Sequence, residues 1–232
     1  MKKMKKLSVS ILATVAILLS SCSLDNEDEN QGIIPGTEVT SQNLAGNLTT
    51  DLRLTSGIAH NLIGALLVKD GAILTIDAGT RINALAGGTD VYILVEKGGK
   101  IIADGTADNP IVFTSNATNP QPGDWGGIIL NGKAPLSRQA GSDSNSAAEV
   151  NAAILYGGAI SEDNSGILNY VKIEYTGARI DDEAEHNGLT LNGVGAGTVI
   201  SNIAILNGDD DGIEFFGGTV SATNLYLENN ED

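Results

Sequence analysis

The sequence predicts an all-β protein, a right-handed parallel β-helix with an N-terminal cap. The first reason is a short phrase that returns at nearly constant spacing. It reads DNSGI at residues 163–167, EHNGL at 185–189 and DDDGI at 209–213, and it begins again at Glu231. The first acids of these phrases are 22, 24 and 22 residues apart. A fixed period in the twenties indicates a solenoid in which each repeat is one rung stacked on the last.

The second reason is the pattern between the phrases, where apolar residues alternate with other residues at the period of a β-strand. When the runs 170–173, 202–205 and 224–227 are aligned, their apolar positions form two columns. The columns are Val171, Ile203 and Leu225, then Ile173, Ile205 and Leu227. Parallel stacking would bury both columns inside the coil. Its right-handedness follows from the general handedness of parallel crossovers.

The chain begins with a secretory signal, for which we assign residues 1–21. Four lysines precede an apolar run of 13 residues, which is too short to span a bilayer as a stable helix. The next residues, Leu19-Ser-Ser-Cys22, resemble a bacterial lipobox, so Cys22 is the expected lipid attachment site. It is the only cysteine, which excludes an intramolecular disulfide.

Charge narrows the possible partners and the compartment. The formal net charge is −16, and removal of residues 1–21 leaves nine basic and 29 acidic side chains. Nucleic acid is excluded as a partner because phosphate recognition needs clustered lysine and arginine. We interpret residues 22–45 as an acidic flexible tether. Acids directly after Cys22 resemble the surface-export signal of Bacteroidota lipoproteins, which implies an outer-membrane lipoprotein at the cell surface; a periplasmic linker is the alternative.

The β-helix domain is assigned to residues 46–232. Residues 37–61 are expected to form the cap and first strands, since an open solenoid end exposes strand edges. Residues 67–76 are echoed by residues 94–103, an offset of 27, which predicts two successive rungs. Residues 134–153 are expected to form an external loop, and Trp125 to pack at a rung corner. Because the fourth phrase stops after Glu231-Asp232, we expect the whole protein to be longer.

Several segments together resemble a poorly characterised family of right-handed parallel β-helix lipoproteins from Bacteroidota. They are residues 72–80, 123–127 and 163–166, and the run GDDDGIEFFGG at 208–218. The likeness covers the chain from about Gly46 onward. It implies the fold and the compartment more than an activity.

The acids of the repeated phrase are the candidate metal ligands. If the register holds, Asp163, Glu185, Asp209 and Glu231 stack about 4.8 Å apart along one corner, joined by Asp210 and Asp211. Like charges at that spacing repel by roughly 3–4 kcal/mol at an effective dielectric of 20. A bound Ca²⁺ would relieve this repulsion. The alternative is a solvated corner in which the acids cap turns.

Enzyme chemistry is suggested by the fold alone. A polysaccharide lyase needs a basic proton acceptor, and Lys172 and Arg179 are the nearest candidates to the acids. Lys172 should point outward in one column with Ala204 and Tyr226, where Lys172 and Tyr226 could contact a glycan. His60 and His186 have no partners at metal or triad spacing, and no catalytic residue can be named.

The sequence thus favours a surface lipoprotein that presents a β-helix for binding or adhesion, with a polysaccharide as the possible ligand. A carbohydrate-active enzyme, such as a polysaccharide lyase, is the first alternative. A structural stalk for further modules is the second.

Overall fold

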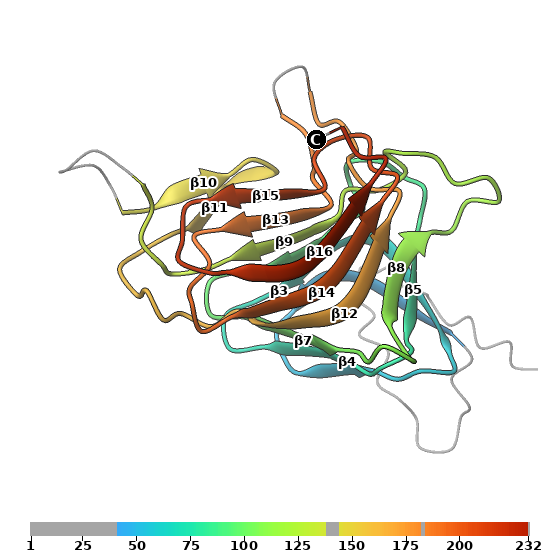
Figure 1. Ribbon diagram of the computed structural model, residues 1–232, viewed down its shortest axis with the longest axis horizontal. Helices are drawn as coiled ribbons and strands as arrows, with labels where there is room; N and C mark the ends of the chain where they lie inside the picture. The colour runs from blue at the N-terminus through green and yellow to red at the C-terminus, as the bar shows by residue number, and fades with distance from the viewer. Residues whose placement is uncertain (1–40, 138–143, 182–183, 232) are drawn as a thin grey trace, which may run out of the picture. The chain divides into compact units, whose positions relative to one another are not determined.

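The structure is a computed structural model that describes residues 41–137, 144–181 and 184–231. These residues form 16 β-strands and no helix, so none of them belongs to a helix long and apolar enough to cross a membrane. Fourteen strands belong to one parallel sheet that winds into a coil, and two form a separate antiparallel pair (Figure 1). The predicted parallel β-helix is confirmed, and the coil is consistent with right-handed winding.

Strand pairing divides each turn of the coil into three faces, here called A, B and C in chain order. Face A contains β2 (Leu52–Leu54), β4 (Ile73–Ile76), β7 (Lys100–Asp104) and the first halves of β12 (Gly166–Glu174), β14 (Val199–Leu206) and β16 (Ala222–Glu228). Face B contains the first halves of β1 (Ser41–Leu48) and β3 (Ala59–Val68), then β5 (Arg81–Ala84), β8 (Ile111–Ser115) and the second halves of β12, β14 and β16. Face C contains the second halves of β1 and β3, then β6 (Ile93–Val95), β9 (Ile128–Asn131), β13 (Leu189–Asn192) and β15 (Ile213–Phe216).

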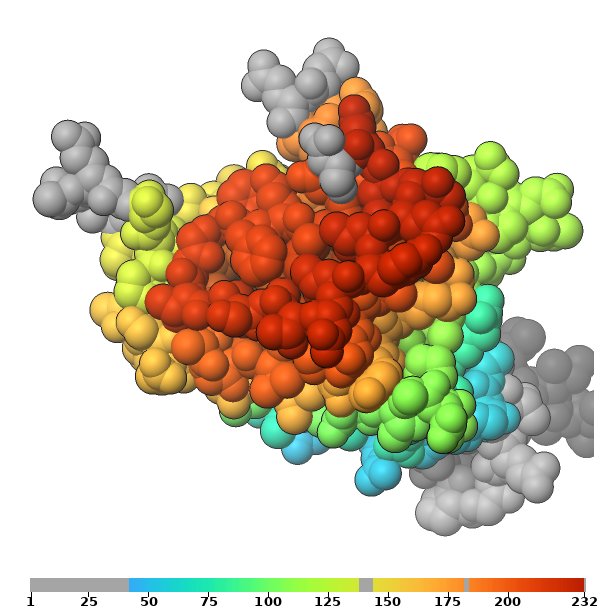
Figure 2. All heavy atoms as spheres, viewed as in Figure 1, coloured from blue at the N-terminus to red at the C-terminus, as the bar shows by residue number. Residues whose placement is uncertain are grey.

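The predicted apolar columns are confirmed by the register of the strands. Val171 pairs with Ile203, which pairs with Leu225, and Ile173 stands in the same relation to Ile205 and Leu227. The first two members of each column are buried, whereas the two leucines of β16 are about 40% exposed on the last described rung. Figure 2 shows this rung, in red, spread over the face toward the viewer.

The 27-residue repeat is also confirmed, because Leu67 and Val68 pair with Leu94 and Val95. Face A carries the same offset, since Leu74 pairs with Ile101. Val68, Val95, Leu74 and Ile101 belong to one continuous core with Trp125 and Phe113, its two largest fully buried side chains. Each fully buried leucine or isoleucine contributes roughly 1.5–3 kcal/mol. Trp125 was expected to pack at a rung corner. It has a packing role and is fully buried in the core, and its Nε1–H donates to the Glu174 carbonyl oxygen at 2.8 Å.

Single residues with left-handed backbone turn the chain from face A to face B. Tyr170, Asn202 and Asn224 have φ values of 48°, 55° and 55° and stack in one column. Asparagine tolerates this region better than most residues. The amide of Asn224 donates to the Asn202 side chain at 3.1 Å, and that of Asn202 donates to Asn169 at 2.8 Å. This asparagine ladder links three consecutive rungs.

The first strand corrects the N-terminal boundary. β1 begins at Ser41, inside the stretch expected to be a tether, and Leu44 is buried in the core. Residues 37–61 were expected to form the cap and first strands, and from Ser41 onward they do form the first rungs, as β1 pairs in parallel with β3. The predicted signal, Cys22 and the tether up to residue 40 lie outside the described residues.

The predicted external loop contains a hairpin that covers part of face C. β10 (Ser146–Ala148) and β11 (Asn151–Tyr156) pair in antiparallel fashion. Val150 and Ile154 pack on Tyr92, Leu94 and Ile129, a small second core outside the coil. The excursion therefore has a defined docking position, which Figure 1 shows beside the strands of face C.

Candidate functional site

The predicted column of acids is wrong for Asp163. Gly166, three residues after Asp163, begins face A and pairs with Ile101, whereas Glu185 and Asp209 precede the face C strands β13 and β15. Asp163 therefore lies at the corner between faces C and A. Its carboxylate accepts the backbone N–H of Lys133 at 2.8 Å. The phrase DNSGI resembles the other two in sequence but precedes a different strand, which explains the misplaced register.

The remaining acids gather at the corner between faces B and C with partners that the sequence did not indicate. We call Glu149, Glu185, Asp210, Asp211 and Glu214 the acidic edge. Burial raises the pKa of Glu149, and the charges of Glu185 and Asp210 raise it further. Glu149 comes from the hairpin turn, so this proximity depends on a segment far from the others in sequence.

Two further carboxyls of the acidic edge are perturbed in the same direction. Burial raises the pKa of Asp210, with smaller contributions from the neighbouring carboxylates, including Glu231. Burial also raises the pKa of Glu214. The hydrogen bond that the Asn187 amide donates to this carboxylate at 2.6 Å lowers the pKa by a smaller amount. Like charges in a partly desolvated site disfavour ionisation of one another.

A metal ligand set does not form among the described residues. No three His, Cys, Asp or Glu side chains in that part of the chain are placed so that they could share a metal ion. Calcium normally takes six to eight oxygen ligands. The predicted calcium site at Glu185, Asp209, Asp210, Asp211 and Glu231 stays a prediction, without Asp163.

The acidic edge borders only a small recess. Glu149 and Val150 of the hairpin face Glu185, His186 and Thr190 across about 10 Å³. This volume is close to that needed for one water molecule. A sugar ring does not fit in it, so the acidic edge has no room for a glycan in this arrangement.

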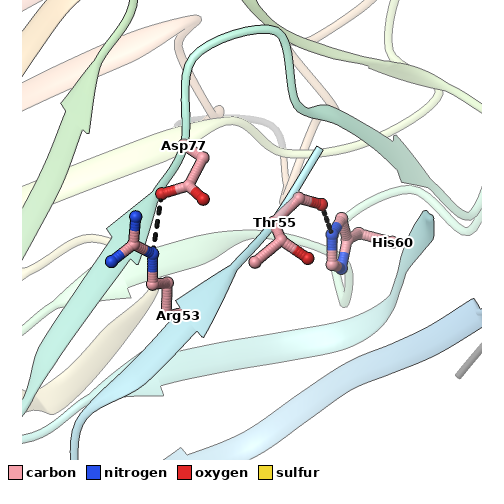
Figure 3. Close-up of polar contacts among 4 residues, drawn as sticks. All are labelled: Arg53, Thr55, His60 and Asp77. Atoms are coloured by element: carbon pink, nitrogen blue, oxygen red, sulfur yellow. Dashed lines mark hydrogen bonds and ion pairs between the residues drawn. The ribbon is translucent and has the colours of Figure 1, made fainter. Parts of the chain in front are cut away.

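The two histidines are buried and act as local structural groups. The Nε2 of His60 lies 2.8 Å from the Thr55 carbonyl oxygen, near the Arg53–Asp77 ion pair (Figure 3). The Nε2 of His186 lies 3.0 Å from the Thr89 carbonyl oxygen, and burial lowers the pKa of its imidazole. Both rings are almost completely buried, which fits a packing role better than proton transfer to a ligand.

The predicted glycan contacts lie on face B. Lys172 pairs with Ala204, which pairs with Tyr226, so the expected outward column is confirmed. Lys172 forms an ion pair with Glu174 at 2.9 Å, and the Tyr226 hydroxyl donates to Glu228. The other lyase candidate, Arg179, lies 3.8 Å from Glu185. Each group therefore has a partner, and no cleft is described around them.

A more spacious hollow than the recess lies elsewhere, between the hairpin and the corner that joins face C to face A. We call it the hairpin groove. It has a volume of about 550 Å³, within the range of small-molecule sites. It is lined by Leu67, Lys69, Glu96, Lys97, Asn151, Ala153, Ile154 and Leu155. One wall comes from two stacked rungs and the other from β11.

Charged side chains of two successive rungs line the hairpin groove. Because Val68 pairs with Val95, the residues after them, Lys69 and Glu96, are neighbours, and they form an ion pair. The ammonium of Lys97 donates to the Asn145 side chain at 2.6 Å and to the Gly157 carbonyl oxygen at 3.3 Å. Lys97 thus ties both ends of the hairpin to the coil and fixes the second wall of the groove.

Comparison with known proteins bears on this arrangement. Residues 46–232 match the sequence profile of a family described as pectate-lyase like beta helix domain. The match covers most of the chain and all strands except the start of β1. The search of curated proteins and the search of solved structures each gave no match.

Proposed function

The chain belongs to the family of pectate-lyase-like β-helix domains, and from that premise we propose that it binds an extended glycan in the hairpin groove. The observation that carries the proposal is the groove itself. It combines apolar surface with a few charged and amide groups. Sites of this kind use apolar contact for affinity and a few polar groups for orientation.

The composition of the groove suits a sugar chain. Leu67, Ile154 and the half-exposed Leu155 offer apolar surface to the C–H faces of sugar rings. Asn151, Lys69 and Lys97 offer donors for ring and hydroxyl oxygens. These groups can hold and orient a sugar chain, so binding is the function that the chemistry of the groove supports.

A carbohydrate-active enzyme is the second candidate. It is favoured by the raised pKa values of Glu149, Asp210 and Glu214, because carboxyls with perturbed pKa values gather at functional sites as well as in structural networks. Hydrolysis would use one protonated and one ionised carboxyl. The recess at the acidic edge holds only about 10 Å³, so this candidate needs the hairpin tip to move away from Glu185 and His186.

We propose further that the protein is a lipoprotein anchored through Cys22 and exposed at the cell surface. The signal-like residues 1–21 and the lone cysteine support this proposal. Mass spectrometry of the N-terminal peptide from membranes tests it, because lipidation adds acyl mass to Cys22. Protease treatment of intact cells tests the surface location; a protected chain would instead indicate a periplasmic location.

The binding proposal is tested with a glycan array on the full chain, with absorbance at 235 nm followed on every polysaccharide that binds. Binding without a rise in absorbance or reducing ends supports the binding function. Formation of cleavage products contradicts binding alone and supports the carbohydrate-active enzyme. A chain that binds no glycan contradicts both and favours the structural stalk.

A further inference from the structure

The hairpin of β10 and β11 is joined to the coil by backbone hydrogen bonds only at its base. Its two strands form a sheet of their own and pair with no strand of the coil (Figure 1). In the described part of the chain, backbone bonds from the hairpin to the coil begin at Gly157 and Gly158, whose N–H groups donate to Gly132 and Ala134 at 2.8 and 3.1 Å. A two-stranded hairpin is marginally stable by itself. Its position therefore depends on side-chain contacts.

The side chains that hold the hairpin down form a core of their own. Val150 and Ile154 pack on Tyr92, Leu94 and Ile129 outside the coil, and this cluster is separate from the continuous core inside. Parting the outer cluster leaves the inward-facing side chains in contact with one another. Local opening of such a unit needs less free energy than global unfolding.

The surface beneath the hairpin changes from apolar to polar along the coil. On the outward side of face C, the register places Leu94, Ile129, Thr190 and Glu214 in one column. Thr190 and the neighbouring outward residue Asn192 are 5% and 3% exposed, although both point away from the core. They line the recess together with the hairpin turn. The hairpin therefore buries polar side chains that would otherwise face water.

Two features of this surface act against the covered state. Asn131 accepts a hydrogen bond from Asn192 at 2.9 Å, but its own Nδ2 is buried and has no hydrogen-bond partner among the described residues. A buried donor without a partner disfavours the arrangement that buries it. At the turn, Glu149 faces Glu185 across the recess of about 10 Å³, so two carboxylates repel where little water can screen them. The cation nearest to Glu185 is the exposed Arg179, 3.8 Å away.

We propose that the hairpin is a flap, which opens about Gly157 and Gly158 while the coil stays folded and so uncovers the polar part of face C. Gly157 has a φ of 87°, a left-handed conformation that glycine adopts without strain. Lys97 is the strap of the flap. Its ammonium donates to the Asn145 side chain and to the Gly157 carbonyl oxygen, one at each end of the hairpin, and so favours the closed state.

Opening of the flap changes what face C offers to a ligand. The hairpin groove and the recess border different parts of the hairpin, namely residues 151–155 and residues 148–150. Lifting the hairpin joins them into one cleft along the outward column from Leu67 to Glu214. This column crosses five rungs, or about 19 Å at the spacing of paired strands. The inference goes beyond the proposed function, because the flap opens or stays shut whichever ligand the groove takes.

Thiol labelling tests the flap in the full chain with Cys22→Ser, because Cys22 is the only cysteine. Thr190→Cys places a thiol beneath the hairpin, and Leu191→Cys places one in the core from the same strand. The probe is N-ethylmaleimide, a neutral thiol reagent. We expect Thr190→Cys to react at least about tenfold faster than Leu191→Cys, because local opening costs less than unfolding. Ala84→Cys, also fully buried, is the second core reporter in case Leu191→Cys does not fold.

Two substitutions should move the labelling rate of Thr190→Cys in opposite directions. Lys97→Gln removes the strap and should raise the rate at least about threefold, since two charge-assisted hydrogen bonds are lost. Lys100→Gln is its control, because it removes the same charge from β7 on face A. Glu149→Gln removes the repulsion at the turn and should lower the rate. Loss of a nearby negative charge by itself favours the reactive thiolate, so a lower rate reports closure of the flap.

Two results would overturn the flap. Equal labelling rates for Thr190→Cys and Leu191→Cys would show that the hairpin lifts only when the coil unfolds. Fast labelling of Thr190→Cys that neither Lys97→Gln nor Glu149→Gln changes would show that the reagent reaches this position without opening. The labelling contains no glycan, so either result leaves the proposed glycan binding standing. A glycan array without hits, in turn, leaves the flap standing.

Discussion

The asparagine ladder allows a sharp prediction at Asn202. This residue has a left-handed backbone at the bend between faces A and B, and its side chain both donates to Asn169 and accepts from Asn224. Asn202→Ala removes both hydrogen bonds and places a Cβ-bearing residue without a polar side chain in the left-handed region. Each bond contributes about 0.5–1.5 kcal/mol net. The backbone adds about 1–2 kcal/mol.

We therefore expect Asn202→Ala to lower the free energy of unfolding by roughly 2–5 kcal/mol. Asn202→Gly loses the same two bonds, but glycine adopts the left-handed region freely. After the greater entropy of its unfolded state is counted, the glycine variant should be more stable than the alanine variant by about 0.5–1 kcal/mol. Ser221→Ala, at an exposed position before β16, is the control and should change little.

Urea unfolding followed by fluorescence measures these differences. Trp125 is the only tryptophan and is fully buried, so its emission reports the loss of the core. If the glycine variant is as unstable as the alanine variant, or more so, the left-handed bend is not what Asn202 provides. If neither variant shifts the midpoint, the ladder itself does not stabilise the rungs.

Three further predictions follow from other parts of the coil. Gly127→Ala should abolish folding, because φ is +137° and the new Cβ would lie 2.0 Å from the Asn187 carbonyl oxygen. Gly64→Ala is the control and should fold, because the atom nearest to its new Cβ is 3.5 Å away. Soluble yield and circular dichroism compare the two variants. Trp125→Phe leaves the Glu174 carbonyl oxygen without its buried donor and should cost about 1–3 kcal/mol in urea unfolding followed by circular dichroism. Glu149→Gln should raise the melting temperature at pH 7. The raised pKa of Glu149 means that its ionised form destabilises the folded state, so the advantage of glutamine should shrink as the pH falls toward the ordinary value of 4.5. A constant advantage from pH 7 to pH 4.5 would contradict that reasoning.

The fold followed from the sequence because repetition determines it. The columns at Val171 and Ile173 and the echo of Leu67 by Leu94 are visible in the alternation of residues, and each pairs as expected. The same reasoning misplaced Asp163, since a phrase of five residues does not say which of three corners it occupies. Rung position comes from the strand that follows, and here Gly166 pairs with Ile101.

The candidate site could not be predicted to the same extent. The echo of Lys69-Asp70-Gly71 in Glu96-Lys97-Gly98 indicates a corner, and the sequence alone places Lys69 beside Glu96. The second wall of the groove comes from β11, more than fifty residues further on, in a stretch without periodicity. Only the docking of Val150 and Ile154 on the outside of face C brings that wall to the lysines.

Cysteine pairs test the register on which the whole description depends. In the full chain with Cys22→Ser, the pair Lys172→Cys and Ala204→Cys occupies directly opposed outward positions on β12 and β14. Their Cα separation suits a disulfide, so mild oxidation should join them rapidly. The pair Lys172→Cys and Leu206→Cys is two residues out of register and should join slowly. Faster closure of the second pair, or closure of neither, would contradict the stacked, in-register coil.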